Sequence, residues 1–396
     1  MTLADRIASG VKATLGANVV DMASNALLVV VLTRVLLSPR GFGRLNFALS
    51  AVGVVSVFAT LGLHKSAARY VTEFAETDPG QVPWVLRRSF VFVAALVVLV
   101  AGGMAVFGGP VARALGTPSL APFVLVGSLY VAARAFSGYF SALFQGFNRV
   151  TWSAVLGVVS GVARFVGVIA LVALGFGVVG ALVGYVVAAG AAALVGGFVV
   201  YARFYRRYEA ADRPAEGLSR RILEYSVPLT ASLSANVLDK KVDVLLVGVL
   251  LNMTSVGYYT VAKQVSDVVA LPATSFGFTI SPAIGEQRSG NRTDRAADLY
   301  RRSLRYVLLL YVPGVTGLVL VAAPTVRYVF GPDYLPAVPV VQVYSGFILV
   351  NAVNKVTSDG LDYLGRARSR AVIRTAMAVN VDDAVESTDA EAGTGQ

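Results

Sequence analysis

Long runs of apolar residues, separated by short polar segments, form the main pattern of this chain. Several runs reach the roughly 20 residues that a helix needs to cross about 30 Å of hydrocarbon. Reading each run between charged or Pro- and Gly-rich breaks predicts about ten complete spans. They cover residues 15–37, 43–63, 89–109, 120–144, 152–174, 178–201, 222–251, 256–282, 306–323 and 338–360. The pattern predicts an all-α polytopic membrane protein.

Composition supports this class and narrows the chemistry. Of the 396 residues, 56% are hydrophobic and 14% are charged, whereas soluble domains average about 25% charged residues. The chain has no cysteine and one histidine, which excludes disulfides, thiolate nucleophiles and Cys/His metal sites. Any function must therefore use other chemistry. We also expect no metal, no other cofactor and no enzymatic reaction.

Basic residues indicate the orientation of the chain. Residues 1–14 place Leu3, Ile7 and Val11 four apart among charged neighbours, as in a short interfacial helix. With the amino terminus inside, most of the 34 Lys and Arg residues fall on cytoplasmic segments. We expect a multi-pass plasma-membrane protein with a cytoplasmic amino terminus. The net charge of +11 then reflects topology and gives no reason to expect nucleic acid.

The first predicted span has a second copy in the seventh. Residues 17–32, ANVVDMASNALLVVVL, align without gaps on residues 235–250, ANVLDKKVDVLLVGVL, and nine of the sixteen positions are identical. Six predicted spans separate the copies, so both cross the membrane in the same direction, as in two parallel six-helix bundles around a central cavity. This predicts a first bundle over residues 15–201, a cytoplasmic linker over 202–221 and a second bundle over 222–380.

The end of the chain departs from this repeat. The offset between the copies predicts an eleventh span from about residue 370 and a twelfth behind it. Residues 381–396 are instead acidic and nearly free of bulky apolar side chains, which is typical of disorder. The second bundle is therefore predicted to be truncated, unless the tail is an unrelated extension of a ten-span protein.

Charged residues inside the spans are the candidates for a functional site. The seventh span carries a polar stripe that occupies an arc of about 100° on an ideal helix: Ser232, Asn236, Asp239, Lys240 and Asp243. Lys241 points roughly a third of a turn away. Each charge at mid-bilayer costs at least about 2.5 to 3.5 kcal/mol, so these side chains should face protein or water. Further polar candidates in other spans are Asn18, Asp21, Arg134, Arg164, Lys263, Asp267 and Lys355.

Two interpretations of these residues stay open. Neighbours such as Lys263 and Asp267 are internal ion pairs that only fix helix packing, or the whole set lines a polar cavity between the two halves. A slightly cationic cavity roofed by lipid suits a substrate with an anionic head and an apolar tail, such as a phosphate-linked lipid. The predicted substrate-binding residues are Arg134, Arg164, Lys240, Lys263, Lys355, Asn18 and Asn236. The candidates for coupling to protons or sodium are Asp21, Asp239, Asp243 and Asp267.

Two stretches resemble a known family, the polysaccharide or lipid-linked oligosaccharide flippases (Wzx-like) of the multidrug/oligosaccharidyl-lipid/polysaccharide (MOP) exporter superfamily. Residues 38–73, SPRGFGRLNFALSAVGVVSVFATLGLHKSAARYVTE, resemble the family's first loop and second span at Pro39, Phe42, Gly43, Gly62, Leu63, Arg69 and Tyr70, with Ser38 in place of the usual Gly. Residues 255–286 resemble a second-half motif at Gly257, Tyr259, Ala262, Pro282 and Glu286.

This resemblance implies a function. Members resemble alternating-access carriers that flip polyprenyl-phosphate-linked or pyrophosphate-linked oligosaccharide from the cytoplasmic to the outer leaflet, for cell-surface polysaccharide or glycoprotein biosynthesis. It also implies membrane lipids and glycosyltransferases of the same pathway as partners. Two alternatives remain: a multidrug/cation antiporter of the same superfamily, and a membrane polysaccharide polymerase or ligase or a non-transporting scaffold. Buried bases argue against a cavity for cationic drugs.

Overall fold

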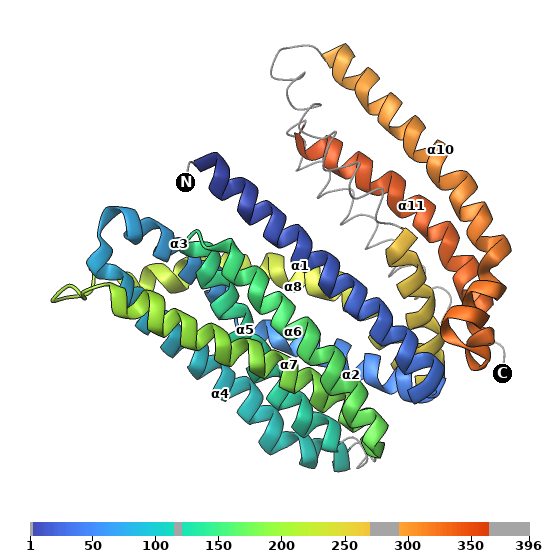
Figure 1. Ribbon diagram of the computed structural model, residues 1–396, viewed down its shortest axis with the longest axis horizontal. Coiled ribbons are helices and arrows are strands. Elements are labelled where there is room, and N and C mark those ends of the chain that lie inside the picture. Colours follow the sequence, from blue (N-terminus) through green and yellow to red (C-terminus); the bar gives the residue numbers. More distant parts are fainter. Residues whose placement is uncertain (1–2, 115–120, 270–292, 364–396) are drawn as a thin grey trace, which may run out of the picture. The chain divides into compact units, whose positions relative to one another are not determined.

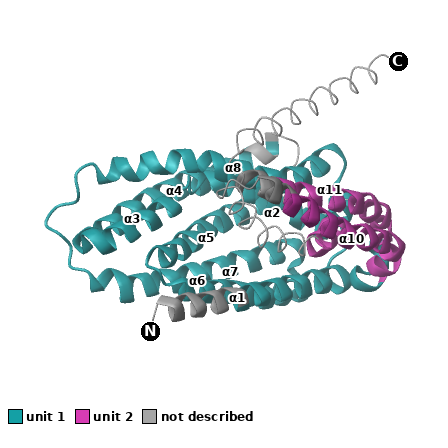
Figure 2. Ribbon diagram, turned by 90° about the horizontal axis from the view of Figure 1, so that it is seen from above, with its two compact units in different colours: residues 1–260, 328–334 teal, residues 261–327, 335–396 magenta. Residues whose placement is uncertain are grey.

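The computed structural model describes residues 3–114, 121–269 and 293–363. The chain divides into two compact units, residues 1–260 with 328–334 and residues 261–327 with 335–396 (Figure 2). All regular elements in the described ranges are helical. The predicted fold class, an all-α polytopic membrane protein, is confirmed, whereas the repeat of two six-helix bundles stays a prediction.

The described part of unit 1 is built from long helices (Figure 1). Their bounds are α1 Leu3–Val31, α2 Pro39–Phe58, α3 Leu63–Thr77, α4 Val82–Ala114, α5 Ala121–Gly146, α6 Val150–Leu171, α7 Gly177–Val199 and α8 Leu218–Leu250. Single π-helical or 3-10 turns flank them: η1 Leu32–Leu36, η2 Pro79–Gln81, η4 Val172–Phe176, η5 Val200–Phe204 and η6 Tyr205–Arg207. Helix α1 runs unbroken through the predicted junction between interfacial helix and first span.

Most predicted spans coincide with helices that are long and apolar enough to cross a membrane. Among the described residues seven such segments occur: Gly16–Leu36, Pro39–Phe58, Pro79–Pro110, Pro122–Gly146, Val150–Arg207, Asp298–Phe330 and Pro332–Asn354. The fifth contains both α6 and α7, so eight predicted spans are accounted for. Helix α8 forms as predicted but is not among these segments, because its cluster of charged residues from 239 to 243 lowers its hydropathy.

The second predicted span, residues 43–63, ends earlier than expected. Helix α2 stops at Phe58, and α3 begins at Leu63 after a tight turn. In this turn Leu61 has φ 40° and Gly62 has φ 71°, the left-handed region that glycine enters without steric cost. Helix α3 is not a candidate span. It is amphipathic and buries the face formed by Leu63, Ala67, Val71 and Phe74.

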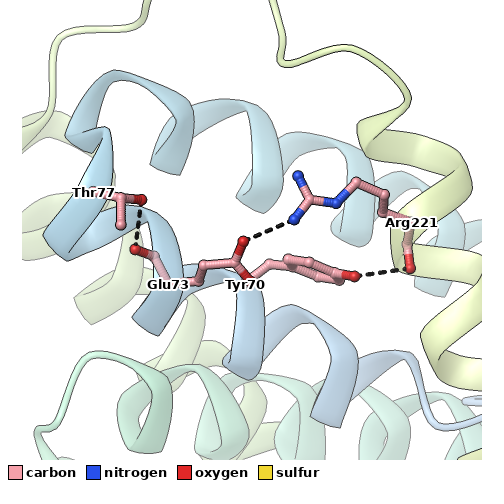
Figure 3. A network of polar contacts seen from close by, with 4 residues as sticks. All are labelled: Tyr70, Glu73, Thr77 and Arg221. Carbon is pink, nitrogen blue, oxygen red and sulfur yellow. Dashed lines mark hydrogen bonds and ion pairs between the residues drawn. The ribbon is translucent and has the colours of Figure 1, made fainter.

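A polar network fastens α3 to the first turns of α8 (Figure 3). Arg221 Nη2 lies 2.7 Å from Glu73 Oε1, and the Tyr70 hydroxyl donates to the Arg221 carbonyl oxygen at 3.2 Å. The buried Ser66 hydroxyl donates to the carbonyl oxygen of Ile222 at 2.8 Å. Since the Glu73–Arg221 pair is partly exposed, we expect it to add little stability by itself. The bond from Ser66 is buried and therefore shielded from solvent, so we expect it to contribute more than the exposed pair.

The segment predicted as a linker, residues 202–221, folds back onto the start of α4. The indole Nε1 of Trp84 donates to the carbonyl oxygen of Ala211 at 2.9 Å. Gln81 donates to the Arg213 carbonyl oxygen at 3.1 Å and accepts from the backbone N–H of Ala215 at 2.7 Å. These bonds tie the connection between α7 and α8 to the helix bundle.

Close helix contacts frame the interior of unit 1. Helix α6 packs on α7 and α1, and α5 packs on α7. A side chain on Gly184 of α7 would come within 2.6 Å of the Val168 nitrogen of α6, so the glycine permits the close approach. The buried hydroxyls of Ser89 and Tyr139 lie 2.8 Å apart and join α4 to α5.

Unit 2 begins with residues 261–269, the end of a helix that starts at residue 253. It continues with α10 Thr293–Thr325 and α11 Val338–Tyr363, which pack together. The turns η7 Val326–Phe330 and η8 Pro332–Ala337 lie between them in sequence, and residues 328–334 of this connection belong to unit 1. The hydroxyls of Tyr300 and Thr357 lie 2.9 Å apart and join α10 to α11. The rest of the predicted span 256–282, the motif residues Pro282 and Glu286, the predicted eleventh span and the acidic tail 381–396 lie outside the described residues.

Candidate functional site

A cavity of about 890 Å³ lies within unit 1. It is lined by side chains from α1, α2, α3, α5, α6, α7 and α8, so residues far apart in the sequence meet at its walls. Its polar lining residues are Asn18, Asp21, Ser56, Thr60, His64, Tyr130, Arg134, Ser137, Ser141, Gln145, Ser153, Ser160, Arg164, Tyr185, Asn236, Lys240 and Lys241. The volume falls in the range of about 300 to 1,000 Å³ that is typical of small-molecule sites.

Six residues singled out from the sequence line this cavity: Asn18, Asp21, Arg134, Arg164, Asn236 and Lys240. Lys241 also lines it, although the ideal helix placed it away from the stripe. Its stem lies against Gly53 of α2, where an added Cβ would be 3.8 Å from the lysine Cε. A long lysine stem can carry its amine around the helix in this way.

The remaining candidates lie elsewhere. Asp239 is exposed on α8, and Asp243 accepts a hydrogen bond from the Tyr259 hydroxyl at 2.9 Å; neither is among the described lining residues. Lys263 and Asp267 belong to unit 2. Lys355 lies on α11, and its side chain is outside the described part of the structure. The roles predicted for these residues stay predictions.

Asp21 and Arg164 form an ion pair at the cavity wall. Arg164 Nη2 of α6 lies 2.9 Å from Asp21 Oδ1 of α1. Gly161, one turn before Arg164, leaves room for the carboxylate, because an added Cβ would lie 3.3 Å from Oδ1. The Arg164 side chain is 17% exposed and the Asp21 side chain 50%. The predicted phosphate ligand and the predicted coupling acid are therefore direct partners.

Arg164 has a further unused donor. Its Nε atom is buried and makes no hydrogen bond within the described residues. The guanidinium carbon lies 5.9 Å from the centre of the Tyr185 ring, which is itself 5.9 Å from the Tyr130 ring in an edge-to-face contact. Buried polar groups without a partner are rare and mark places where a ligand or water binds. An anion beside Arg164 would satisfy this group.

The neutral lining residues were missed in the sequence. Ser137, Ser141 and Gln145 follow Arg134 on α5 at a helical spacing, and Ser153 and Ser160 precede Arg164 on α6 in the same way. Residues three, four, seven and eleven apart share one face of a helix. This polar periodicity within an apolar span could have predicted these lining residues from the sequence.

His64, the only histidine of the chain, also lines the cavity. It lies in the first turn of α3, directly after the Gly62 turn, and its Nδ1 atom is buried without a hydrogen bond to any residue that the structure describes. Burial, with a smaller contribution from the charge of Lys65, lowers the pKa of His64 from 6.5 to about 4. The imidazole is therefore neutral at pH 7, with one donor and one acceptor nitrogen.

The helices are arranged as in known membrane transporters. A multidrug resistance MATE family transporter of the MOP superfamily, in its inward-facing conformation, gives a TM-score of 0.65 at 16% identity, over 88% of this chain and 82% of the other. The lipid II flippase MurJ, in an inward closed conformation, gives a TM-score of 0.66 at 13% identity. This match covers 90% of this chain and 76% of the MurJ chain. At these identities the likeness shows the fold alone, which is that of a multi-pass transporter.

Sequence comparison then gives the family. Residues 7–287 match the family described as "Polysaccharide biosynthesis protein". The chain belongs to this family, and the resemblance to polysaccharide and lipid-linked oligosaccharide flippases that the sequence predicted is confirmed. It is 22% identical over 154 residues to the "Probable low-salt glycan biosynthesis flippase Agl15" of Haloferax volcanii, across 39% of this chain and 33% of that protein. The matched region thus spans about a third of the length of this curated relative.

Proposed function

We propose that the chain flips a polyprenyl-phosphate-linked oligosaccharide from the cytoplasmic to the outer leaflet of the plasma membrane, with its amino terminus in the cytoplasm. Family membership and a transporter fold with a polar interior cavity support this proposal. Such a substrate has a charged head that needs a polar path and an apolar tail that stays in lipid. The product serves the assembly of cell-surface polysaccharide or glycoprotein.

The observation that carries the proposal is the state of Arg164. Its guanidinium faces a cavity whose lining also includes Arg134, Lys240 and Lys241, and its Nε donor is unused. Arginine binds phosphate through several N–H donors at once. Asp21 holds one of these donors until substrate arrives. A phosphate that enters the cavity then competes with the Asp21 carboxylate, and this competition keeps binding weak enough for release.

The test measures flipping in proteoliposomes. Polyprenyl diphosphate carrying a fluorescent oligosaccharide is placed in both leaflets, and a membrane-impermeant quencher reports the rate at which the protected fraction exchanges. We expect Arg134→Gln and Arg164→Gln to slow exchange by at least about tenfold, the effect of losing a charge-assisted hydrogen bond. Arg113→Gln is the matched control, because Arg113 is exposed and does not line the cavity.

Arg134 provides the cleaner variant. Arg134 is exposed and makes no ion pair within the described residues, whereas Arg164→Gln leaves Asp21 without its arginine. The proposal is wrong if Arg134→Gln, folded to the same melting temperature as the parent chain, exchanges the labelled lipid at the parental rate.

A further inference from the structure

The cavity has two chemically different ends. The charged end contains Asp21, Arg134, Arg164, Lys240 and Lys241. The neutral end contains Thr60, His64, Ser141, Gln145 and Ser153, whose side chains donate and accept hydrogen bonds without carrying charge at pH 7. Serines 56, 137 and 160 line the stretch between them.

Helix geometry sets the distance between the two ends. On α5, eleven positions separate Arg134 from Gln145, and on α6 eleven positions separate Ser153 from Arg164. At about 1.5 Å per residue, each separation is about 16 Å along the helix axis. The two helices are consecutive, and each carries its arginine near its middle and its neutral groups toward the turn that joins the two helices. The separation of the charged end from the neutral end is therefore present along both α5 and α6.

The neutral end is held in place by contacts between three helices. The hydroxyls of Ser141 and Ser153 lie 2.6 Å apart and fix α5 against α6. The Thr72 hydroxyl of α3 donates to the carbonyl oxygen of Gly146 at 2.7 Å. A side chain on Gly146 would collide with the backbone of Ala68, one turn after His64, so α3 and α5 meet closely here. These contacts place His64 beside the last turns of α5.

We propose that the neutral end is the sugar-binding subsite of the cavity, and that it recognises the uncharged hydroxyl and amide groups of the sugars next to the phosphate. This inference rests on the proposed function, which assigns the charged end to the phosphate. Sugar hydroxyls are both donors and acceptors, so they match serine, threonine, glutamine and neutral imidazole side chains.

Three observations favour sugar over a second phosphate at this end. His64 lines the cavity, and its buried Nδ1 has no hydrogen-bond partner in the described residues, so the imidazole has hydrogen-bonding capacity left for a ligand hydroxyl. The imidazole is neutral, and a neutral ring attracts an anion far less than an imidazolium would. The Ser141–Ser153 pair also uses only one hydroxyl proton in its mutual bond, which leaves the other as a donor.

The test compares two lipids on the full chain in nanodiscs. One is polyprenyl diphosphate without sugar, and the other is the same lipid carrying a neutral disaccharide. We expect Gln145→Leu and His64→Leu to weaken binding of the glycosylated lipid by about two- to tenfold each, the effect of one lost hydrogen bond. Binding of the sugar-free lipid should stay unchanged, which also shows that the variants are folded. His64→Gln, which keeps a donor and an acceptor, should restore most of the affinity.

Controls separate this inference from the proposed function. Gln342→Leu makes the same chemical change at an exposed position of α11 in unit 2, where Gln342 donates to the Val319 carbonyl oxygen at 3.3 Å, and should alter neither affinity. Arg134→Gln should weaken the binding of both lipids equally. The sugar subsite is wrong if Gln145→Leu and His64→Leu bind the disaccharide lipid as tightly as the parent does. It is also wrong if these variants lose the same affinity for both lipids; in either case the phosphate site stands. If the parent binds neither lipid, or Arg134→Gln changes neither affinity, the proposed function fails first and the subsite with it.

Discussion

Single residues in this cavity balance charge against burial in different ways. Arg164 is mostly buried, and its positive charge is balanced by the carboxylate of Asp21, whose Oδ1 lies 2.9 Å from Nη2. His64 instead stays neutral, because burial disfavours its charged form and Lys65 adds repulsion. These two side chains suit different ligands. An arginine paired with a carboxylate can bind an anion in place of that carboxylate, and a neutral imidazole can form a hydrogen bond with a hydroxyl group.

The neutrality of His64 predicts a pH dependence of stability. Because the pKa of His64 is about 4 in the folded chain and 6.5 in the unfolded chain, only the unfolded chain binds this proton between these two values. The free energy of unfolding therefore falls as the pH drops from 6.5 toward 4, by at most about 3 kcal/mol, and the full contribution is present above pH 6.5.

Thermal unfolding of the detergent-solubilised protein between pH 7.5 and pH 5 measures this effect. Carboxylates with ordinary pKa values stay mostly ionised in this range, and the chain has one histidine, so His64 dominates. We expect the melting temperature of His64→Gln to change less with pH than that of the parent. Parallel profiles for the two proteins would contradict the assignment.

At the scale of elements, the turn between α2 and α3 shapes one end of the cavity. Gly62 adopts φ 71° and lies close to α8, where an added Cβ would be 2.9 Å from the Ser226 carbonyl oxygen. The turn lets α3 leave the direction of α2 and carries His64 to the wall beside α5. The same helix then binds α8 through Ser66 and the Glu73–Arg221 pair.

Gly62→Ala should therefore be costly. The left-handed backbone costs a residue with a Cβ about 1 to 2 kcal/mol, and the contact with Ser226 adds to that loss. Gly190→Ala on α7 is the matched control: nothing lies within 4 Å of its added Cβ, and helix propensity favours alanine by roughly 0.5 to 1 kcal/mol. We expect a lower melting temperature for the first variant and an equal or higher one for the second. Equal melting temperatures for Gly62→Ala and the parent would show that the turn relaxes.

The sequence predicts long helices well because hydrophobic length alone indicates a span, as for α4 and α7. It did not predict the turn at Gly62, since glycine is common inside membrane helices and no charge marks this one. For the site, charge in an apolar run was a sufficient signal for Arg134, Arg164 and Lys240. Charge gave no signal for Ser141 or Ser153, which are neutral. A serine in a helix usually forms a hydrogen bond with the backbone of its own helix, so its presence does not by itself indicate a site.

At the scale of the whole molecule, the distribution of basic residues gives a testable orientation. Most Lys and Arg residues of the chain, including the group in 202–221, were assigned to the cytoplasmic side. Because the chain contains no cysteine, single cysteines report topology without background. Asp212, in the linker, and Leu251, after α8, are exposed positions on predicted opposite sides.

We expect a membrane-impermeant maleimide to label Asp212→Cys only in inside-out vesicles and Leu251→Cys only in right-side-out vesicles. The physical reason is that positively charged segments are retained on the cytoplasmic side during insertion. Flipping activity of each single-cysteine protein serves as the control for native folding. The reversed labelling pattern would place the amino terminus outside and contradict the proposed direction of transport.

The pair between Asp21 and Arg164 also bears on how the chain is made. Its two members are 143 positions apart, and synthesis proceeds at about 5 to 20 residues per second, so the acid exists for about 7 to 30 seconds before its partner. In lipid an unpartnered carboxylate on α1 costs about 2.5 to 3.5 kcal/mol during that time. The first helix therefore carries an unpaired acid until α6 is synthesised, and the apolar residues of the span Gly16–Leu36 must offset that cost in the meantime.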